Sequence, residues 1–293
     1  METQKLVVIT GAHGFIANSL RRWLEARDQK VCLLDLRDPA WESFDFTKAD
    51  TVIHTAALVH KSEKEHPIEE YRQINRDLTL KLAEKAKAQG VPHFIFFSTM
   101  AVYGSRSSCF GTCAVDENTP TAPDTKYGIT KLEAEEALRA MEDEHFHLAV
   151  IRPPFVYGRD CPGNYRTLRA LTLRIGLIPR LPNKKSMIYI DNLCACVDGI
   201  REKGLTGVFC PQNARIVSTW ELAEEIARCN GKNPHVLCLL NPFVKLGSLA
   251  VRKLRTAFGT EYYTTSLSTV EGLDYNVVSF EDSIRRTEDF HTT

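Results

Sequence analysis

The sequence has no excess of charge of either sign and no long apolar run. Its 37 Lys and Arg residues balance its 37 Asp and Glu residues, and its pI is near 7.1. Domains that bind nucleic acid are usually basic, so we expect no nucleic-acid partner. No segment approaches the ~18 uninterrupted apolar residues of a membrane span, so we also expect no membrane partner.

Cysteine is present, but not in the arrangements that bind metals. The nine cysteines are odd in number and scattered, mostly inside apolar runs. The two close pairs, Cys109 with Cys113 and Cys194 with Cys196, lack a second pair or a well-spaced histidine, so we expect no metal site. Reduced thiols are typical of the cytoplasm. The first expected strand begins at Leu6, which leaves no room for a signal peptide and again indicates a cytoplasmic protein.

In the first half of the chain, short β-rich runs alternate with helical stretches. The expected strands are Leu6–Thr10, Val31–Asp35, Thr51–His54, Phe94–Ser98 and Leu148–Arg152. The expected helices are Ala17–Ala26, Ile68–Gly90 and Tyr127–Met141, the last with its Glu and Lys residues on outer positions. This alternation predicts an α/β fold with a doubly wound parallel sheet.

The pattern changes after Arg152, where prolines and glycines interrupt it. Beyond this point we expect helices over 165–176 and 191–202, strands over 186–190 and 207–210, a helix opened by a capping box at Ser218, and a terminal helix from Ser279. Residues 241–275 have no clear period and receive no assignment.

A glycine-rich turn joins the first strand to the first helix. It reads Gly11-Ala12-His13-Gly14-Phe15-Ile16-Ala17, and Asp35 ends the second strand 24 residues beyond Gly11. A helix N-terminus after such a turn holds a pyrophosphate, and a carboxylate at Asp35 can accept both ribose hydroxyls of an adenosine. The pattern predicts NAD. NADP remains an alternative, because Arg37 could bind the 2′-phosphate that Asp35 would repel.

A second motif offers a hydroxyl, a phenol and an ammonium. Tyr127 and Lys131 are four residues apart and share one face of a helix. A phenol titrates near ~10, and a nearby cation should lower that pKa toward neutrality. Such a pair can move a proton on and off an alcohol oxygen while a nicotinamide moves a hydride.

With these two motifs, the chain resembles the extended short-chain dehydrogenases/reductases, in their NAD-dependent epimerase/dehydratase branch. The likeness covers nearly the whole chain and is strongest over residues 5–192. It implies a catalytic set of Thr99, Tyr127 and Lys131. It also implies a Rossmann domain over 1–160, completed by 186–212, with a nucleotide-sugar-binding lobe over 161–185 and 213–293. In this family the helices Ile68–Gly90 and Tyr127–Met141 often pair into a homodimer, which we expect here.

The resemblance also implies the residues around the cofactor. Asp45 and Phe46 would flank the adenine, while His54 and His60 are more readily interpreted as structural histidines than as proton carriers. Alternation along the strand should turn Ser98 away from Thr99. The full expected cofactor set is Gly11, His13, Gly14, Phe15, Ile16, Asp35, Arg37, Asp45, Phe46, Thr55, Ala56, Ala57, Asn75, Ser98, Tyr127, Lys131 and Pro154.

For the substrate, the resemblance implies a nucleotide sugar held by Thr99, Met100, Asn164 and Lys185. Family dehydratases place an Asp-Glu pair where this chain has Met100-Ala101, so we expect no dehydration. The motif Arg152-Pro153-Pro154-Phe155 is similar to that of 4-ketoreductases, whereas galactose epimerases carry asparagine at the Phe155 position. We therefore expect reduction of a UDP-4-keto-6-deoxy-N-acetylhexosamine, with UDP-sugar 4-epimerisation as the alternative. A reductase of a non-nucleotide ketone and a non-enzymatic NAD(P) sensor remain further alternatives.

Overall fold

The computed structural model describes residues 5–59, 65–104 and 106–289. These residues form two compact units, each assembled from separate stretches of the chain. The first unit draws on the described residues up to 104 and on 120–153 and 194–211, and the second draws on 106–119, 154–193 and the described residues from 212 onward. The boundaries differ from those of the expected domains, because 106–119, 154–160 and 186–193 belong to the second unit. The functional division into cofactor and sugar domains stays a prediction.

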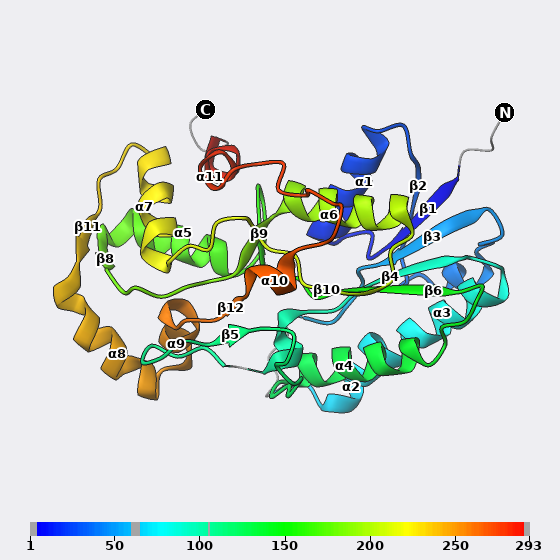
Figure 1. The fold of residues 1–293 in the computed structure, drawn as a ribbon, viewed down its shortest axis with the longest axis horizontal. Coiled ribbons are helices and arrows are strands. Elements are labelled where there is room, and N and C mark those ends of the chain that lie inside the picture. Colours follow the sequence, from blue (N-terminus) through cyan, green and yellow to red (C-terminus); the bar gives the residue numbers. More distant parts are fainter. Residues whose placement is uncertain (1–4, 60–64, 105, 290–293) are drawn as a thin grey trace. The chain divides into compact units, whose positions relative to one another are not determined.

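The first unit is built on a six-stranded parallel sheet, as expected (Figure 1). Its strands stand in the order β10 (Gly207–Phe209), β6 (His147–Ile151), β4 (His93–Phe97), β3 (Ala49–His54), β1 (Leu6–Thr10) and β2 (Lys30–Leu34). Helices α1 (Phe15–Glu25) and α6 (Ile190–Lys203) lie over one face, and α3 (Leu78–Ala88) and α4 (Lys126–Arg139) lie over the other. Covered on both faces, the strands are apolar almost throughout.

The order of the strands reverses at β1. From β1 the chain moves outward to β2, and it then returns to the other side of β1 to form β3. In open α/β sheets, ligands bind outside the carboxyl ends of the strands at such a switch point. The loops that follow β1 and β3 are therefore the place to look for a cofactor site.

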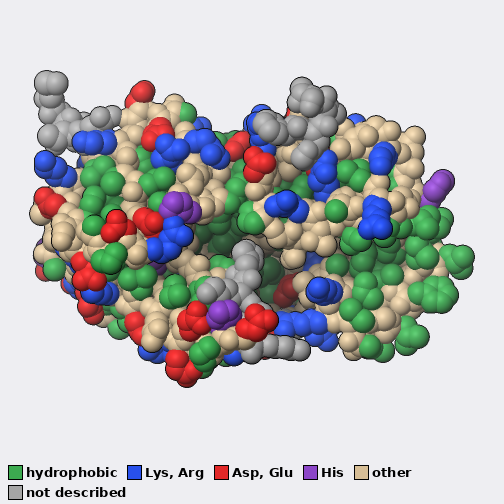
Figure 2. Space-filling view, turned by 180° about the vertical axis from the view of Figure 1, so that it is seen from behind, with side chains coloured by type: hydrophobic (Ala, Val, Ile, Leu, Met, Phe, Trp, Pro, Cys, Tyr) green, Lys and Arg blue, Asp and Glu red, His purple; other side chains and the backbone are tan. Residues whose placement is uncertain are grey.

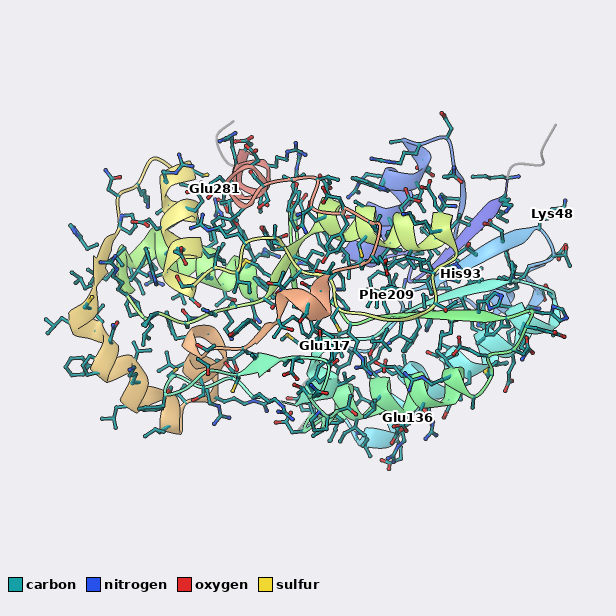
Figure 3. All side chains as sticks on the ribbon, viewed as in Figure 1. Lys48, His93, Glu117, Glu136, Phe209 and Glu281 are labelled. Atoms are coloured by element: carbon teal, nitrogen blue, oxygen red, sulfur yellow. The ribbon has the colours of Figure 1, made fainter. Side chains whose placement is uncertain are left out.

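Two details of the helices differ from expectation. The expected helix Ile68–Gly90 is divided into α2 (Ile68–Arg72), a π turn over Gln73–Asp77 and α3. In α4, Lys131 and Glu135 are buried at 0% and 1% exposure, so the expected outer placement of its Glu and Lys residues is wrong for these two. The adjacent Glu136 is exposed and points away from the sheet (Figure 3).

The second unit contains three small parallel strand pairs and a set of helices. The pairs are β7 (Phe155–Tyr157) with β9 (Met187–Tyr189), β8 (Leu177–Pro179) with β11 (His235–Leu237), and β5 (Ala114–Val115) with β12 (Tyr262–Tyr263). The helices are α5 (Asn164–Ile175), α7 (Thr219–Cys229), α8 (Asn241–Ala250), α9 (Arg252–Phe258), α10 (Thr265–Ser268) and α11 (Phe280–Glu288). The capping box at Ser218 is confirmed. None of the helices in the described part of the chain has the length and apolarity to cross a bilayer.

Candidate active site

The loops after β1 and β3 pack directly against each other. Gly11 has a φ of +85°, and a Cβ at this position would lie 2.7 Å from Thr55 Oγ1 and 3.1 Å from the Ala56 nitrogen. Gly14 donates its N–H to the Gly11 oxygen at 2.7 Å and forms the N-cap of α1. Only glycine combines this backbone conformation with so close an approach, so the turn forms a narrow cradle at the helix N-terminus.

Asn75 fastens the loop after β3 to the rest of the unit. Its Oδ1 accepts from the Leu58 N–H at 2.7 Å, and its Nδ2 donates to the Leu58 oxygen at 3.2 Å and to Thr130 Oγ1 at 3.1 Å. The side chain is fully buried in the π turn. It therefore ties the loop that carries Thr55, Ala56 and Ala57 to helix α4.

The carboxylate of Asp35, at the carboxyl end of β2, is held by two neighbours, Arg37 and His13. Arg37 donates from Nε and from a terminal nitrogen to the two carboxylate oxygens at 3.1 and 3.0 Å, and His13 Nε2 lies 3.0 Å from Oδ2. These contacts, that with Arg37 above all, hold the pKa of Asp35 well below its usual value. Asp35 and Arg37, expected to favour different cofactors, thus form one pair.

The remaining expected cofactor residues fall into two groups. Phe15 and Ile16 lie in the first turn of α1, and Asp45 is exposed beyond a short 3-10 turn. Phe46 and Pro154 are buried, and the Phe46 ring belongs to the hydrophobic core of the sheet with no exposed surface. The Phe46 ring is therefore placed to pack the core rather than to face solvent.

Thr99 and Tyr127 are brought together at the carboxyl end of β4. The Tyr127 phenol and the Thr99 hydroxyl are hydrogen-bonded, and Thr99 Oγ1 also accepts from the Ala101 N–H at 3.2 Å. Ser98 makes a different contact, since its buried hydroxyl donates to Glu135. The two adjacent hydroxyls thus have separate partners, and the one on Thr99 meets the phenol.

Lys131 lies one turn further along α4 and is completely buried. Its Nζ sits 3.8 Å from the centre of the Phe96 ring and has no hydrogen-bond partner among the described residues. A buried ammonium without a partner is costly unless a bound molecule supplies one. Hydroxyl groups of a nicotinamide ribose are suitable acceptors, so Lys131 fits the cofactor that the glycine turn indicates.

The expected lowering of the Tyr127 pKa by Lys131 is wrong in this structure. Burial raises the pKa of Tyr127 to about 12, although the Thr99 hydrogen bond acts in the opposite direction. The same burial lowers the pKa of Lys131 to about 7, despite the nearby Glu135 carboxylate. Burial therefore disfavours the charged form of both groups, the ammonium of Lys131 and the phenolate of Tyr127.

A buried ion pair behind Lys131 was not anticipated from the sequence. Glu135 accepts from Arg152 at 2.5 to 3.2 Å through Nε and a terminal nitrogen, and Arg152 donates to the Tyr103 hydroxyl at 2.8 Å. Tyr127, Lys131 and Glu135 recur at intervals of four residues on α4, which places all three on one helix face. That spacing was the available signal for Glu135.

The residues expected to bind substrate are divided between the units. Met100 follows Thr99 in the first unit, with its N–H bonded to the Pro153 oxygen at 3.0 Å. In the second unit, Asn164 is the exposed first residue of α5, and Lys185 Nζ donates to Ser107 Oγ at 3.2 Å. Burial lowers the pKa of Lys185, and Glu261 opposes that shift. No contact between Asn164 and Lys185 is found among the described residues.

His54 is a structural residue, as expected. Its ring nitrogens lie 2.7 Å from Thr10 Oγ1 and 2.8 Å from Thr79 Oγ1, and burial lowers its pKa well below the usual value. A neutral imidazole in the core, with both ring nitrogens in hydrogen bonds, is a poor proton carrier. His60 lies outside the described residues.

Comparisons with known proteins show the family. The model of the NAD dependent epimerase/dehydratase family matches residues 7–178. A UDP-glucose 4-epimerase of Vibrio cholerae is 29% identical over 252 residues, which are 76% of this chain and 75% of that protein. An Escherichia coli O157:H7 protein named N-acetyl-alpha-D-glucosaminyl-diphospho-ditrans,octacis-undecaprenol 4-epimerase is 30% identical over 164 residues, 54% of this chain and 47% of its own length.

Two solved structures show the same fold over almost the whole chain. A dTDP-4-dehydrorhamnose reductase from Clostridium acetobutylicum has a TM-score of 0.76 at 20% identity and covers 97% of this chain and 99% of its own. A UDP-glucuronic acid 4-epimerase from Bacillus cereus, solved with NAD, has a TM-score of 0.74 at 20% identity, covering 97% and 96%.

The fold is of the Rossmann type. More narrowly, the chain belongs to the NAD-dependent epimerase/dehydratase family. The resemblance noted in the sequence is thereby confirmed. The protein is an NAD-dependent enzyme, an oxidoreductase or epimerase of the nucleotide-sugar type.

Proposed function

We propose that the protein reduces the C4 ketone of a UDP-4-keto-6-deoxy-N-acetylhexosamine. The observation that carries this proposal is the hydrogen bond between the Tyr127 phenol and the Thr99 hydroxyl at the carboxyl end of β4. A phenol held in its protonated form is the proton donor that a ketone reduction requires.

In the proposed reaction, bound NADH would supply the hydride that adds to C4 and breaks the C=O π bond. Thr99 donates its hydroxyl hydrogen bond to the C4 oxygen and holds it beside Tyr127. Tyr127 transfers its phenolic proton to that oxygen as the alkoxide forms, which leaves an alcohol on the sugar and a phenolate on the enzyme. The ammonium form of Lys131 would stabilise the phenolate until solvent restores the proton.

The residues present suit this cofactor. The turn through Gly11 and Gly14 leads into the N-terminus of α1, whose first backbone N–H groups suit a pyrophosphate. The unpartnered Lys131 Nζ suits the ribose hydroxyls on the nicotinamide side, and Asp35 suits those on the adenosine side.

Two features favour reduction. The first is Pro153-Pro154, where the chain is similar to 4-ketoreductases. The second is Phe155, which stacks on Tyr157 with ring centres 6.3 Å apart in the place of the asparagine of galactose epimerases. Epimerisation at C4 is the second candidate, favoured by the names of the relatives from Vibrio cholerae and Escherichia coli. It would use the same three side chains in both directions.

Cofactor consumption separates these two reactions. A reductase given a UDP-4-keto sugar and NADH should consume one NADH per sugar, measured as the loss of absorbance at about 340 nm. An epimerase should interconvert UDP-GlcNAc and UDP-GalNAc with no such loss. A third assay offers N-acetylglucosamine linked to undecaprenyl diphosphate, because the Escherichia coli relative is named for that substrate. Interconversion without absorbance change, and no turnover of the keto sugar, would overturn the reductase proposal.

The Asp35 and Arg37 pair is expected to set the choice between NAD and NADP. Asp35→Ala should weaken NADH binding and lower the ratio of NADH affinity to NADPH affinity by about tenfold. The substitution removes a hydrogen-bond acceptor and a charge that repels the 2′-phosphate. Arg37→Ala is the reciprocal control and should widen the preference for NADH. Fluorescence titration with both nucleotides measures the effect. A wild type that binds NADPH tenfold tighter than NADH would contradict the assignment.

A cytoplasmic homodimer remains our proposal for the assembly. Three apolar residues of the segment expected as the helix Ile68–Gly90 suit a contact between subunits by their spacing. Leu82 is fully buried in the sheet core, whereas Ile74 and Leu78 are partly exposed. Ile74 and Leu78 are therefore the positions to test by sedimentation of charged variants.

A further inference from the structure

Helix α8 presents its apolar side chains outward. Phe243, Leu246 and Leu249 are 72%, 69% and 67% exposed, while the buried residue of this helix is the polar Ser248. The Ser248 hydroxyl donates a hydrogen bond to the backbone oxygen of Lys245, one turn earlier in the helix, at 2.6 Å. A helix that packs only against its own protein buries its apolar side chains and exposes its polar ones. The exposed apolar face of α8 therefore indicates a binding surface.

The exposed apolar surface continues beyond α8. Leu239, in the turn before the helix, is 78% exposed. Strand β11 pairs in parallel with β8, next to α5, and Ile175 and Leu177 at this junction are also exposed. Figure 2 shows hydrophobic side chains gathered at its right-hand edge, where α8 lies. We call Ile175, Leu177, Leu239, Phe243, Leu246 and Leu249 the α8 patch.

The segments that form the α8 patch carry only positive charge. Residues 161–190 contain six Lys or Arg and no Asp or Glu, and residues 226–260 likewise contain six and none. This is a marked local departure in a chain whose charges balance overall. Lys245 lies within α8, and Arg252 and Lys253 are exposed directly after it. Arg169 and Arg228 are paired with Glu288 and Glu225. The cations of α8 and of the segment directly after it favour an apolar partner with an anionic surface.

We propose that the α8 patch docks on the surface of a bilayer that contains anionic phospholipids. Phe243, Leu246 and Leu249 would enter the boundary between headgroups and acyl chains, and Lys245, Arg252 and Lys253 would contact the headgroup phosphates. A second copy of the chain is disfavoured because it would bring like charges together. A nucleic acid would leave the leucines unused.

This docking differs from membrane spanning, which no described helix can do. Span length was the basis of the expectation that the protein has no membrane partner, and a helix that lies flat on a membrane needs amphipathicity rather than length. Docking of this kind does not depend on which sugar the active site takes.

Vesicle co-sedimentation of the full chain tests the proposal. The wild type should pellet with vesicles of phosphatidylcholine and phosphatidylglycerol in equal parts, and much less with phosphatidylcholine alone. Salt at about 0.5 M should weaken the binding, because headgroup attraction is screened at that ionic strength. The double variant Phe243→Glu/Leu246→Glu should lower the bound fraction at least about tenfold, since it places two charges in the apolar layer.

Val277→Glu is the matched control, because Val277 is 54% exposed in the same unit but outside the α8 patch. It should bind vesicles as the wild type does. Circular dichroism and catalytic activity of the soluble protein should be unchanged in both variants. The proposal is overturned if the wild type fails to pellet with anionic vesicles, or if the double variant pellets equally well. It is also overturned if sedimentation velocity shows that the double variant only converts a dimer into a monomer.

Discussion

Tyr127→Phe should lower turnover by roughly 10²–10⁴-fold while leaving the fold and the affinity for NADH intact. The substitution removes only the phenolic oxygen, which is the proposed source of the proton and the partner of the Thr99 hydroxyl. The ring, which contributes to packing at the start of α4, is retained. Steady-state turnover of the keto sugar and fluorescence titration of NADH measure the two expected results.

Glu136→Gln is a suitable control for this experiment, because Glu136 lies on the same helix and is exposed (Figure 3). Its turnover should match that of the wild type. Near-normal turnover of Tyr127→Phe on the true substrate would show that another group delivers the proton, and the mechanism would have to be abandoned.

Lys131→Met should abolish most turnover, by about 10²-fold or more, weaken NADH binding, and yet stabilise the protein in the absence of nucleotide. The wild type buries an amine that has no hydrogen-bond partner among the described residues. Methionine has a similar length and no polar atom to desolvate. Removal of such a group should raise the free energy of unfolding by roughly 1–3 kcal/mol at neutral pH.

The pH dependence of this difference has a definite sign. Burial lowers the pKa of Lys131 from 10.5 to about 7, so between these values the unfolded chain binds more protons than the folded one. Wild-type stability should therefore gain from this residue as the pH rises from about 7 toward 10. The advantage of Lys131→Met should be largest at or below pH 7 and shrink above it.

Urea denaturation across this pH range measures the effect. Lys81→Met, at an exposed position on α3, is the control and should change stability by no more than about 0.5 kcal/mol. If Lys131→Met is less stable than the wild type at pH 7, then the lysine is not an uncompensated buried amine.

The sequence was sufficient to predict the sheet because its strands are buried on both faces and read as apolar runs. Each of the five expected strands lies within two residues of an observed one, from Leu6–Thr10 to His147–Ile151. The glycine turn was equally predictable, since Gly11 requires both a positive φ and a close neighbour. The spacing also predicted helix α4, which the structure has at Lys126–Arg139.

Features that depend on tertiary contacts were not predictable in this way. The spacing of Glu135 from Tyr127 and Lys131 gives its helix face, but its burial depends on Arg152, which follows the distant strand β6. The raised pKa of Tyr127 depends on how deeply the phenol is buried, which no spacing reveals. Helix α8 received no assignment because its apolar residues face outward, so its sequence lacks the usual helical period of buried apolar and exposed polar residues.

The amide of Asn75 restricts how the candidate cofactor site can be redesigned. It acts at once as an acceptor for one N–H and as a donor to two oxygens, all in the interior. Aspartate has the shape but no N–H to give, and leucine has neither kind of atom. Combinatorial libraries aimed at new cofactors or sugars can therefore randomise Asp35, Arg37 and Met100 while the codon for Asn75 is held constant.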